Sequence, residues 1–325
     1  MTRTKMTTAA FVLALAAGAA GAKDTGYVFV SSENDNAVTV LDGKTWRVVK
    51  TIPTGHRPRD MRLSPDRMLL YVVSSKNNRV DVIDIAHLKV TRSIPVGEDP
   101  EMFDLSADGK RLYVSNEEGA QLSVIDVASS KAVARVEVGE EPEGVRVSPD
   151  GKRVYVTSEV ANMVHVVDTA TNNIVANVIV GNRPRRFAIT PDGSEVWVSN
   201  EMGARVSIID AGRNAVKGNV DFKPKGFRPD DVTPVGITMT RDGKTAYVTL
   251  GRANHVAVVD VASREVQDYL LVGKRAWGVA LNRDESQLYV VNGLSDDLSI
   301  IDTRSRKVLR SVHVGRVPHS VVIDD

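Results

Sequence analysis

The sequence predicts an all-β fold, a seven-bladed β-propeller with four-stranded blades, on three observations. An aromatic anchor recurs at separations of 44, 42, 42, 42, 50 and 42 residues, as Tyr27, Tyr71, Tyr113, Tyr155, Trp197, Tyr247 and Tyr289. The Asp that closes the next apolar run recurs in step, as Asp42, Asp84, Asp126, Asp168, Asp210, Asp260 and Asp302. Strand and turn residues dominate, and no apolar period of 3.6 is sustained. Such a repeat is typical of propeller blades.

The stretch around Val138–Asp168 shows how one blade is built. We expect strands at Gly144–Ser148, Arg153–Ser158, Met163–Asp168 and Ile174–Val180. The first two are joined by Pro149–Lys152, where Pro and Gly supply the turn. Runs such as VHVVD are apolar on both faces, which indicates that each sheet is covered on both sides.

The two chain ends are predicted to share one blade. Tyr27–Thr54 supplies only three strands, and Pro318–Asp325 resembles the innermost strand that this blade lacks. Sharing a blade closes the ring and removes exposed sheet edges. Complete blades then begin near Pro58, Pro100, Pro142, Pro184, Pro234 and Ala276, so that residues 23–325 form a single propeller domain.

Residues 1–22 are interpreted as a secretory signal peptide. Arg3 and Lys5 give a positive start, Ala9–Ala19 an apolar centre, and Ala20–Ala22 a small-residue cleavage site. The apolar part is too short for a membrane-spanning helix, so no span is expected in the mature chain. A buried N-terminal helix is the alternative. We expect a periplasmic protein, with full secretion left open; the chain has no Cys.

The charge pattern argues against nucleic acid as a partner. The formal net charge is only +1, and no basic stripe appears. Motifs for phosphate loops, nucleophile elbows and dinucleotide binding are also absent from the sequence. We predict no catalytic residue and no metal site, because the six His show no metal-ligand spacing.

The candidate site is the end of the ring where the blades join. The turns between first and second strands are nearly uniform, whereas the loops between second and third strands vary. The residue after each junction should point toward the axis, and round the ring it is Arg59, Glu101, Glu143, Arg185, Val235, Trp277 and His319. His56 and Arg186 are neighbouring candidates. Arg offers a fork for carboxylate or phosphate, and Trp an apolar face. The alternative is a channel in which Arg and Glu only pair with one another.

Lys217–Thr233 is the one irregular segment, and it accounts for the 50-residue separation. It is interpreted either as a tolerated surface insertion or as a lip over the mouth of the ring.

The repeats YVSN at Tyr113 and WVSN at Trp197 resemble the YVTN family of β-propellers. Glu98–Leu105, Glu141–Lys152, Asn182–Asp210, Pro234–Asp260 and Leu270–Ala280 further resemble the subfamily called PQQ-dependent catabolism-associated β-propeller proteins. The resemblance implies an exported protein linked to alcohol oxidation with pyrroloquinoline quinone. That quinone is then the possible cofactor, and a periplasmic quinoprotein dehydrogenase or cytochrome the possible partner. The pattern leads us to expect an aromatic residue where His319 stands.

Three functions compete at this stage. The first is a non-catalytic periplasmic propeller that binds a small anionic ligand or a protein partner and assists quinone-dependent alcohol oxidation. The second is an enzyme with its site at the mouth, either a lactonase-like hydrolase or a quinoprotein-type oxidoreductase. The third is a pure protein-interaction scaffold. The fold does not decide among them.

Overall fold

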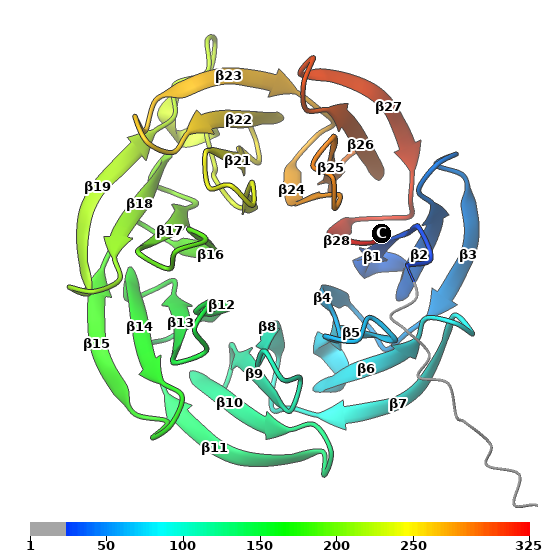
Figure 1. Cartoon of the computed structure of the whole chain (residues 1–325), viewed down its shortest axis with the longest axis vertical. Helices are drawn as coiled ribbons and strands as arrows, with labels where there is room; N and C mark the ends of the chain where they lie inside the picture. The colour runs from blue at the N-terminus through cyan, green and yellow to red at the C-terminus, as the bar shows by residue number, and fades with distance from the viewer. Residues whose placement is uncertain (1–23) are drawn as a thin grey trace, which may run out of the picture.

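The computed structural model of the protein describes residues 24–325, in which seven antiparallel four-stranded sheets surround a central axis (Figure 1). The predicted seven-bladed propeller is confirmed. The predicted signal peptide, residues 1–22, lies outside the described residues.

Each blade runs from an innermost strand at the axis to an outermost strand at the rim. The first blade has the order β28 (Pro318–Asp324), β1 (Tyr27–Ser32), β2 (Ala37–Asp42), β3 (Val48–Pro53). The second and third are β4 (Pro58–Leu63), β5 (Leu69–Ser74), β6 (Arg79–Asp84), β7 (Lys89–Pro95), and β8 (Pro100–Leu105), β9 (Arg111–Asn116), β10 (Gln121–Asp126), β11 (Lys131–Glu137). The fourth and fifth are β12 (Pro142–Val147), β13 (Arg153–Ser158), β14 (Met163–Asp168), β15 (Ile174–Ile179), and β16 (Pro184–Ile189), β17 (Glu195–Asn200), β18 (Arg205–Asp210), β19 (Ala215–Asp221). The last two are β20 (Ile237–Met239), β21 (Thr245–Thr249), β22 (His255–Asp260), β23 (Val266–Leu271), and β24 (Ala276–Leu281), β25 (Gln287–Asn292), β26 (Asp297–Asp302), β27 (Lys307–His313).

Helical structure is minimal. Within residues 24–325 it consists of three 3₁₀ turns, η1 (Glu33–Asp35), η2 (Ser75–Asn77) and η3 (Pro229–Asp231). None of the described helices is long and apolar enough to cross a membrane.

The shared blade closes the ring as predicted. β28 pairs antiparallel with β1, from Tyr27 opposite Asp324 to Ser31 opposite Ser320. The backbone N–H and the hydroxyl of Thr25 donate to Asp324 Oδ2 at 3.0 and 2.6 Å. Arg67 of the next blade reaches the other oxygen, Asp324 Oδ1, at 2.9 Å. One buried carboxylate therefore ties both chain ends to their neighbour.

The core lies between blades. One cluster, for example, packs Phe29 and Val40 of the first blade against Met61 and Val72 of the second. Side chains on both faces of each sheet are thus buried, which explains why the strand sequences are apolar on both faces.

The aromatic anchor of the first blade is Phe29, not Tyr27. Phe29 stands opposite Val40 in the β1–β2 ladder, as Tyr71 stands opposite Val82 in the β5–β6 ladder. Phe29 is fully buried, whereas Tyr27 pairs with Asp42 at the strand start. The correction makes the first separation 42 residues instead of 44.

Most strand limits agree with the prediction to within one or two residues, and β20 departs furthest. It begins at Ile237 instead of near Pro234. Val235 and Gly236 still bond to Thr249, but outside a regular ladder. A Cβ at Gly236 would lie 2.1 Å from Trp277 O, so Gly lets the next blade approach.

Candidate functional site

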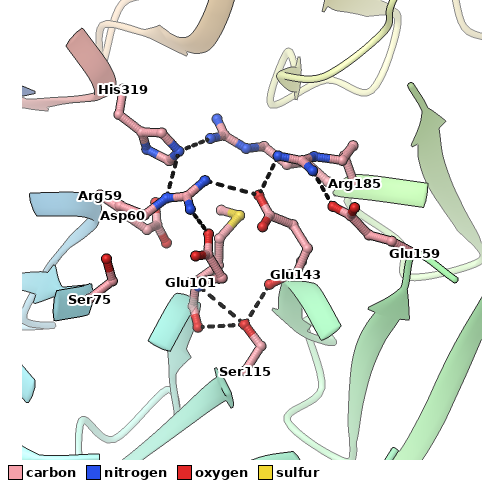
Figure 2. A network of polar contacts seen from close by, with 12 residues as sticks. Arg59, Asp60, Ser75, Glu101, Ser115, Glu143, Glu159, Arg185 and His319 are labelled. Atoms are coloured by element: carbon pink, nitrogen blue, oxygen red, sulfur yellow. Dashed lines mark hydrogen bonds and ion pairs between the residues drawn. The ribbon is translucent and has the colours of Figure 1, made fainter. Parts of the chain in front are cut away.

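At five of the seven junctions, the axis-facing residue is anchored by the blade before it. A hydroxyl on that blade's second strand, two residues after the anchor, donates to the backbone carbonyl of the axis-facing residue. Ser115 donates to Glu143 O at 2.6 Å (Figure 2), and Thr157 donates to Arg185 O at 3.2 Å. Equivalent bonds join Ser31 to Arg59, Ser199 to Val235 and Thr249 to Trp277. Because the carbonyl is fixed, the side chain is directed at the axis. In the other two preceding blades the anchoring position is Val73 or Val291.

The residue before the junction is held in the left-handed conformation, with φ of 60° at Arg275 and 55° at Arg183. That conformation is uncommon for residues other than Gly. An Asn from the preceding blade compensates, since Asn254 Oδ1 accepts from Arg275 N, and Asn162 Oδ1 from Arg183 N, both at 2.8 Å. These two Arg side chains therefore line the mouth of the ring.

The mouth cavity has a volume of about 300 Å³, and its wall includes Arg59, Glu143, Arg185, Trp277 and His319. The structure thus brings together five of the candidate residues. A sixth, Glu101, is fully buried and touches Arg59 beside the cavity.

The other two candidates lie elsewhere. His56 is exposed and contributes nothing to the wall of the mouth cavity. Arg186 lines a second cavity at the opposite end of the axis. Arg186 directly follows Arg185 on β16 and therefore lies further from the mouth along this strand.

One side of the mouth cavity, here called the paired half, is a buried ion-pair network of Arg59, Glu101, Glu143, Arg185 and Glu159 (Figure 2). Arg59 contacts Glu101 directly and has Glu143 at 3.8 Å. Arg185 lies 3.1 Å from Glu143 and also contacts Glu159. The expected Arg–Glu pairing therefore occurs, and it occupies the two Arg first expected to hold an anion.

The electrostatics of the paired half follow from burial and pairing. Burial acts to raise the pKa of Glu143, but the guanidinium groups of Arg185 and Arg59 outweigh it and hold that pKa below its ordinary value. At Glu159 burial prevails and raises the pKa to about 7. Buried ion pairs of this kind are costly to break by removing one partner.

His319 accepts two hydrogen bonds and is neutral. Arg59 Nε donates to His319 Nε2 at 3.3 Å, and Arg186 Nη2 at 3.1 Å (Figure 2). Burial, followed by the charge of Arg59, places the pKa of His319 well below its ordinary value. An imidazole accepts where an indole cannot, which accounts for a His at the position where an aromatic residue was expected.

The opposite side of the mouth cavity, here called the open half, consists of Arg252, Arg275 and Trp277. Among residues 24–325, no carboxylate lies within ion-pair distance of Arg252 or Arg275, and both residues are exposed. The guanidinium carbon of Arg275 lies 4.6 Å from the Trp277 ring centre, and that of Arg185 lies 5.3 Å from it. These are cation–π distances. The Trp277 indole therefore lies beside two guanidinium groups, those of Arg275 and Arg185.

Glu117 is the one carboxyl in the wall of the mouth cavity that makes no ion pair within the described part of the chain. Burial raises its pKa, and the nearby charge of Glu143 adds to the effect. Oxygens of Asp99, Glu101 and Glu117 lie within 4.8 Å of one another. Arg57 lies 3.6 Å from Asp99 and 3.5 Å from Glu101, so a cation at this group would face a guanidinium.

The insertion does not form a lip. Phe222 is buried in a blade core, and the Phe227 ring lies 5.5 Å from that of His255. No residue of 222–233 lines the mouth cavity. Instead Thr233 Oγ1 accepts from the backbone N–H of Arg252 at 2.9 Å, so the insertion supports the loop that carries Arg252.

Sequence reasoning missed Arg252 and Glu117 as site residues. Both lie in loops between second and third strands, LGRAN and NEEGA. Their charge within the varying loops was the available signal. Sequence reasoning also missed the hydroxyl groups that donate to the backbone carbonyls of the axis-facing residues. Their signal is the Ser or Thr two residues after the anchor, in YVS, YVT and WVS.

The chain resembles two families of propellers. The model of the YNCE-like beta-propeller family matches residues 14–148, and that of the lactonase, 7-bladed beta-propeller family matches residues 134–233. Each match covers less than half of the chain. No curated protein matches it.

Solved structures share the fold. Hydrazine synthase of Kuenenia stuttgartiensis is 22% identical with a TM-score of 0.78, covering 86% of this chain and 93% of that one. The periplasmic gluconolactonase PpgL of Pseudomonas aeruginosa is 21% identical with a TM-score of 0.76, covering 91% and 98%. Dihydro-heme d1 dehydrogenase NirN is 18% identical with a TM-score of 0.70, covering 93% and 76%. At these identities the likeness shows the fold alone.

Proposed function

We propose that this protein is a non-catalytic binding propeller that holds a small anionic molecule in the mouth cavity. The observation that carries the proposal is the open half, where Arg252 and Arg275 face the cavity without a carboxylate partner among residues 24–325. Guanidinium groups bind carboxylates and phosphates through charge-assisted hydrogen bonds. The paired half supplies a rigid, nearly neutral wall and leaves the anion to the open half.

Pyrroloquinoline quinone is the first ligand to test. It is planar and anionic, and the resemblance of the sequence to propellers associated with its catabolism singles it out. Periplasmic location and assistance to a quinoprotein dehydrogenase or cytochrome belong to the same proposal, and the predicted signal peptide supports them. A planar ligand would lie against Arg275 or displace it from Trp277.

Calorimetry with pyrroloquinoline quinone tests the proposal. Arg275→Gln and Arg252→Gln should each weaken binding about ten- to hundredfold, because each removes one charge-assisted contact. Arg205→Gln is the matched control, since Arg205 pairs with Asp221 at 3.0 Å on the outer strands, and its affinity should equal that of the wild type. No heat of binding in the wild type would rule out this ligand. Equal affinities in all variants would rule out the open half.

A lactone hydrolase is the second candidate, favoured by the unpaired Glu117 and the lactonase family match over residues 134–233. Glu117 would take a proton from a water molecule while the oxygen of that water attacks the lactone carbonyl carbon. The ring C–O bond then breaks, and the leaving alkoxide recovers the proton from Glu117. The raised pKa suits this exchange.

Hydrolysis of gluconolactone decides between the two candidates. The binding proposal predicts no turnover above the background rate. Turnover in the wild type that falls at least about hundredfold in Glu117→Gln would instead establish the hydrolase. Glu118→Gln, an exposed neighbour, is the control.

A further inference from the structure

A second cavity of about 310 Å³ lies on the axis at the end opposite the mouth, here called the far cavity. The buried layer that contains Arg59, Glu143 and His319 lines the mouth cavity, and none of its members lines the far cavity. The two cavities are therefore separate binding volumes on one axis.

The wall of the far cavity has two unlike sides. Strands β4, β12 and β16 contribute the charged residues Asp60, Arg62, Arg146 and Arg186. Around β20, β24 and β28 the wall carries small or uncharged residues, among them Gly236, Thr238, Gly278, Ala280, Ser320 and Val322. Small residues leave room for an organic group, and the charged side fixes its orientation.

Arg62 and Arg146 in the wall of the far cavity form ion pairs, whereas Arg186 forms none among the described residues. Arg62 lies 3.1 Å from Asp60 and 3.5 Å from Asp104, and Arg146 lies 3.8 Å from Asp104. Arg186 has no carboxylate within ion-pair distance among the described residues, although it is only 7% exposed.

The hydrogen bonds of Arg186 do not balance its charge. Its Nη2 bonds to neutral His319, and its Nε has no hydrogen-bond partner within residues 24–325. Burial lowers the pKa of Arg186 to about 10, so the side chain is still a cation at neutral pH. The charges of Glu143 and Asp60 attract Arg186 from beyond ion-pair distance but do not offset its burial. An anion in direct contact with the guanidinium group therefore lowers the remaining cost of burying this cation.

We propose that the far cavity is a second binding site, which takes a short-chain monocarboxylate on the guanidinium of Arg186 with its hydrocarbon part against the small-residue side. A planar guanidinium matches a carboxylate in geometry. Asp60, whose Oδ2 has no hydrogen-bond partner among the described residues, stands on the same wall and repels a second negative charge. The site therefore prefers monoanions to dicarboxylates.

Thermal unfolding and calorimetry with sodium formate and sodium butyrate test this site, with sodium chloride at equal ionic strength as the reference. Both carboxylates should raise the melting temperature of the wild type, and succinate should do so less. Arg186→Met should melt higher than the wild type without added anion, and its affinity for both carboxylates should fall about tenfold or more. Arg186→Lys should retain a weaker response.

A larger side chain in the far cavity tests where the bound carboxylate lies. Ala280→Leu fills the small-residue side, so it should lose the response to butyrate and keep the response to formate. Arg205→Gln, which changes a residue that lines neither cavity and pairs with Asp221 at 3.0 Å, should leave both responses within about twofold of the wild type. A wild type that responds no more to carboxylates than to chloride would overturn the proposal. So would an unchanged carboxylate response in Arg186→Met, or equal loss of formate and butyrate in Ala280→Leu.

Discussion

The paired half and the open half of the mouth cavity are built by the same repeat, yet only one has its charges neutralised. In the paired half, consecutive blades present Arg59, Glu101, Glu143 and Arg185, so that each cation has a carboxylate on a neighbouring strand. The next three blades present Val235, Trp277 and His319. Arg252 and Arg275, which loops add to the mouth cavity there, have no carboxylate within ion-pair distance among the described residues. One set of positions in the repeat therefore gives paired charges on one side of the ring and unpaired guanidinium groups, among residues 24–325, on the other.

The largest effect is expected from removing the strand that joins the two halves. Deletion of Pro318–Asp325 takes away β28 and with it His319, which contacts Arg59 and lies 6.1 Å from the Trp277 ring. It also exposes the edge of β1. We expect aggregation or loss of cooperative unfolding, measured by light scattering and circular dichroism. A soluble truncation with an unchanged melting temperature would contradict the shared-blade closure.

Breaking the paired half comes next. Glu143→Ala leaves Arg59 and Arg185 facing each other without their shared carboxylate, and should lower the free energy of unfolding by about 3–5 kcal/mol. Urea unfolding measures the change, with Glu118→Ala as the exposed control. A loss below about 1 kcal/mol would mean that the network does not stabilise the ring.

Two carboxyl groups in the wall of the mouth cavity, those of Glu143 and Glu117, should respond oppositely to pH. The folded-state pKa of Glu143 is depressed, so its contribution to stability is present above the unfolded pKa and is lost as pH falls through the folded pKa. The folded-state pKa of Glu117 is raised above 4.5, so its contribution is present below the unfolded pKa and is lost as pH rises through the folded pKa. Unfolding free energies of Glu143→Gln and Glu117→Gln, measured from acid to neutral pH, should diverge from the wild type with opposite slopes. Parallel curves would refute the contrast.

The smallest effect concerns the open half. Arg252→Gln combined with Arg275→Gln should change the free energy of unfolding by no more than about 0.5 kcal/mol, because neither group has an ion-pair partner among residues 24–325. Urea unfolding of the double variant, beside Arg185→Gln, checks this. A loss as large as that of Arg185→Gln would show that these side chains are structural.

The period of the sequence was enough to predict the ring, the shared blade and most strand limits, because burial on both faces leaves a strong apolar pattern. It misplaced the first anchor, because Tyr27 matches the Tyr of five other blades while Phe29, two residues later, performs the packing role. At β20, the close approach of Trp277 O to Gly236 depends on the neighbouring blade, which a local pattern does not contain.

The sequence predicted which residues face the axis at the mouth cavity better than it predicted which of their charged groups pair. Periodicity identifies Arg59, Glu101, Glu143 and Arg185 as residues facing the axis, but distances between blades decide which charges meet. Arg186 differs from Arg185 by one position and faces a different cavity, because successive residues on an innermost strand reach different levels of the axis. Arg252 depends on Thr233, a contact between two loops that no repeat encodes.

The bonding of Thr25 to Asp324 has a consequence for chain connectivity. Because Gly26 N also donates to Asp324 O at 2.7 Å, the two ends of the ring lie side by side. A short peptide could join residues 24 and 325, and new ends could be opened at the exposed turn Asp150–Gly151. Such a circular permutant turns the first blade into an ordinary meander and makes the fourth blade, cut between β12 and β13, the new shared blade. The architecture is thus cyclic in the strict sense that no blade is required to be first.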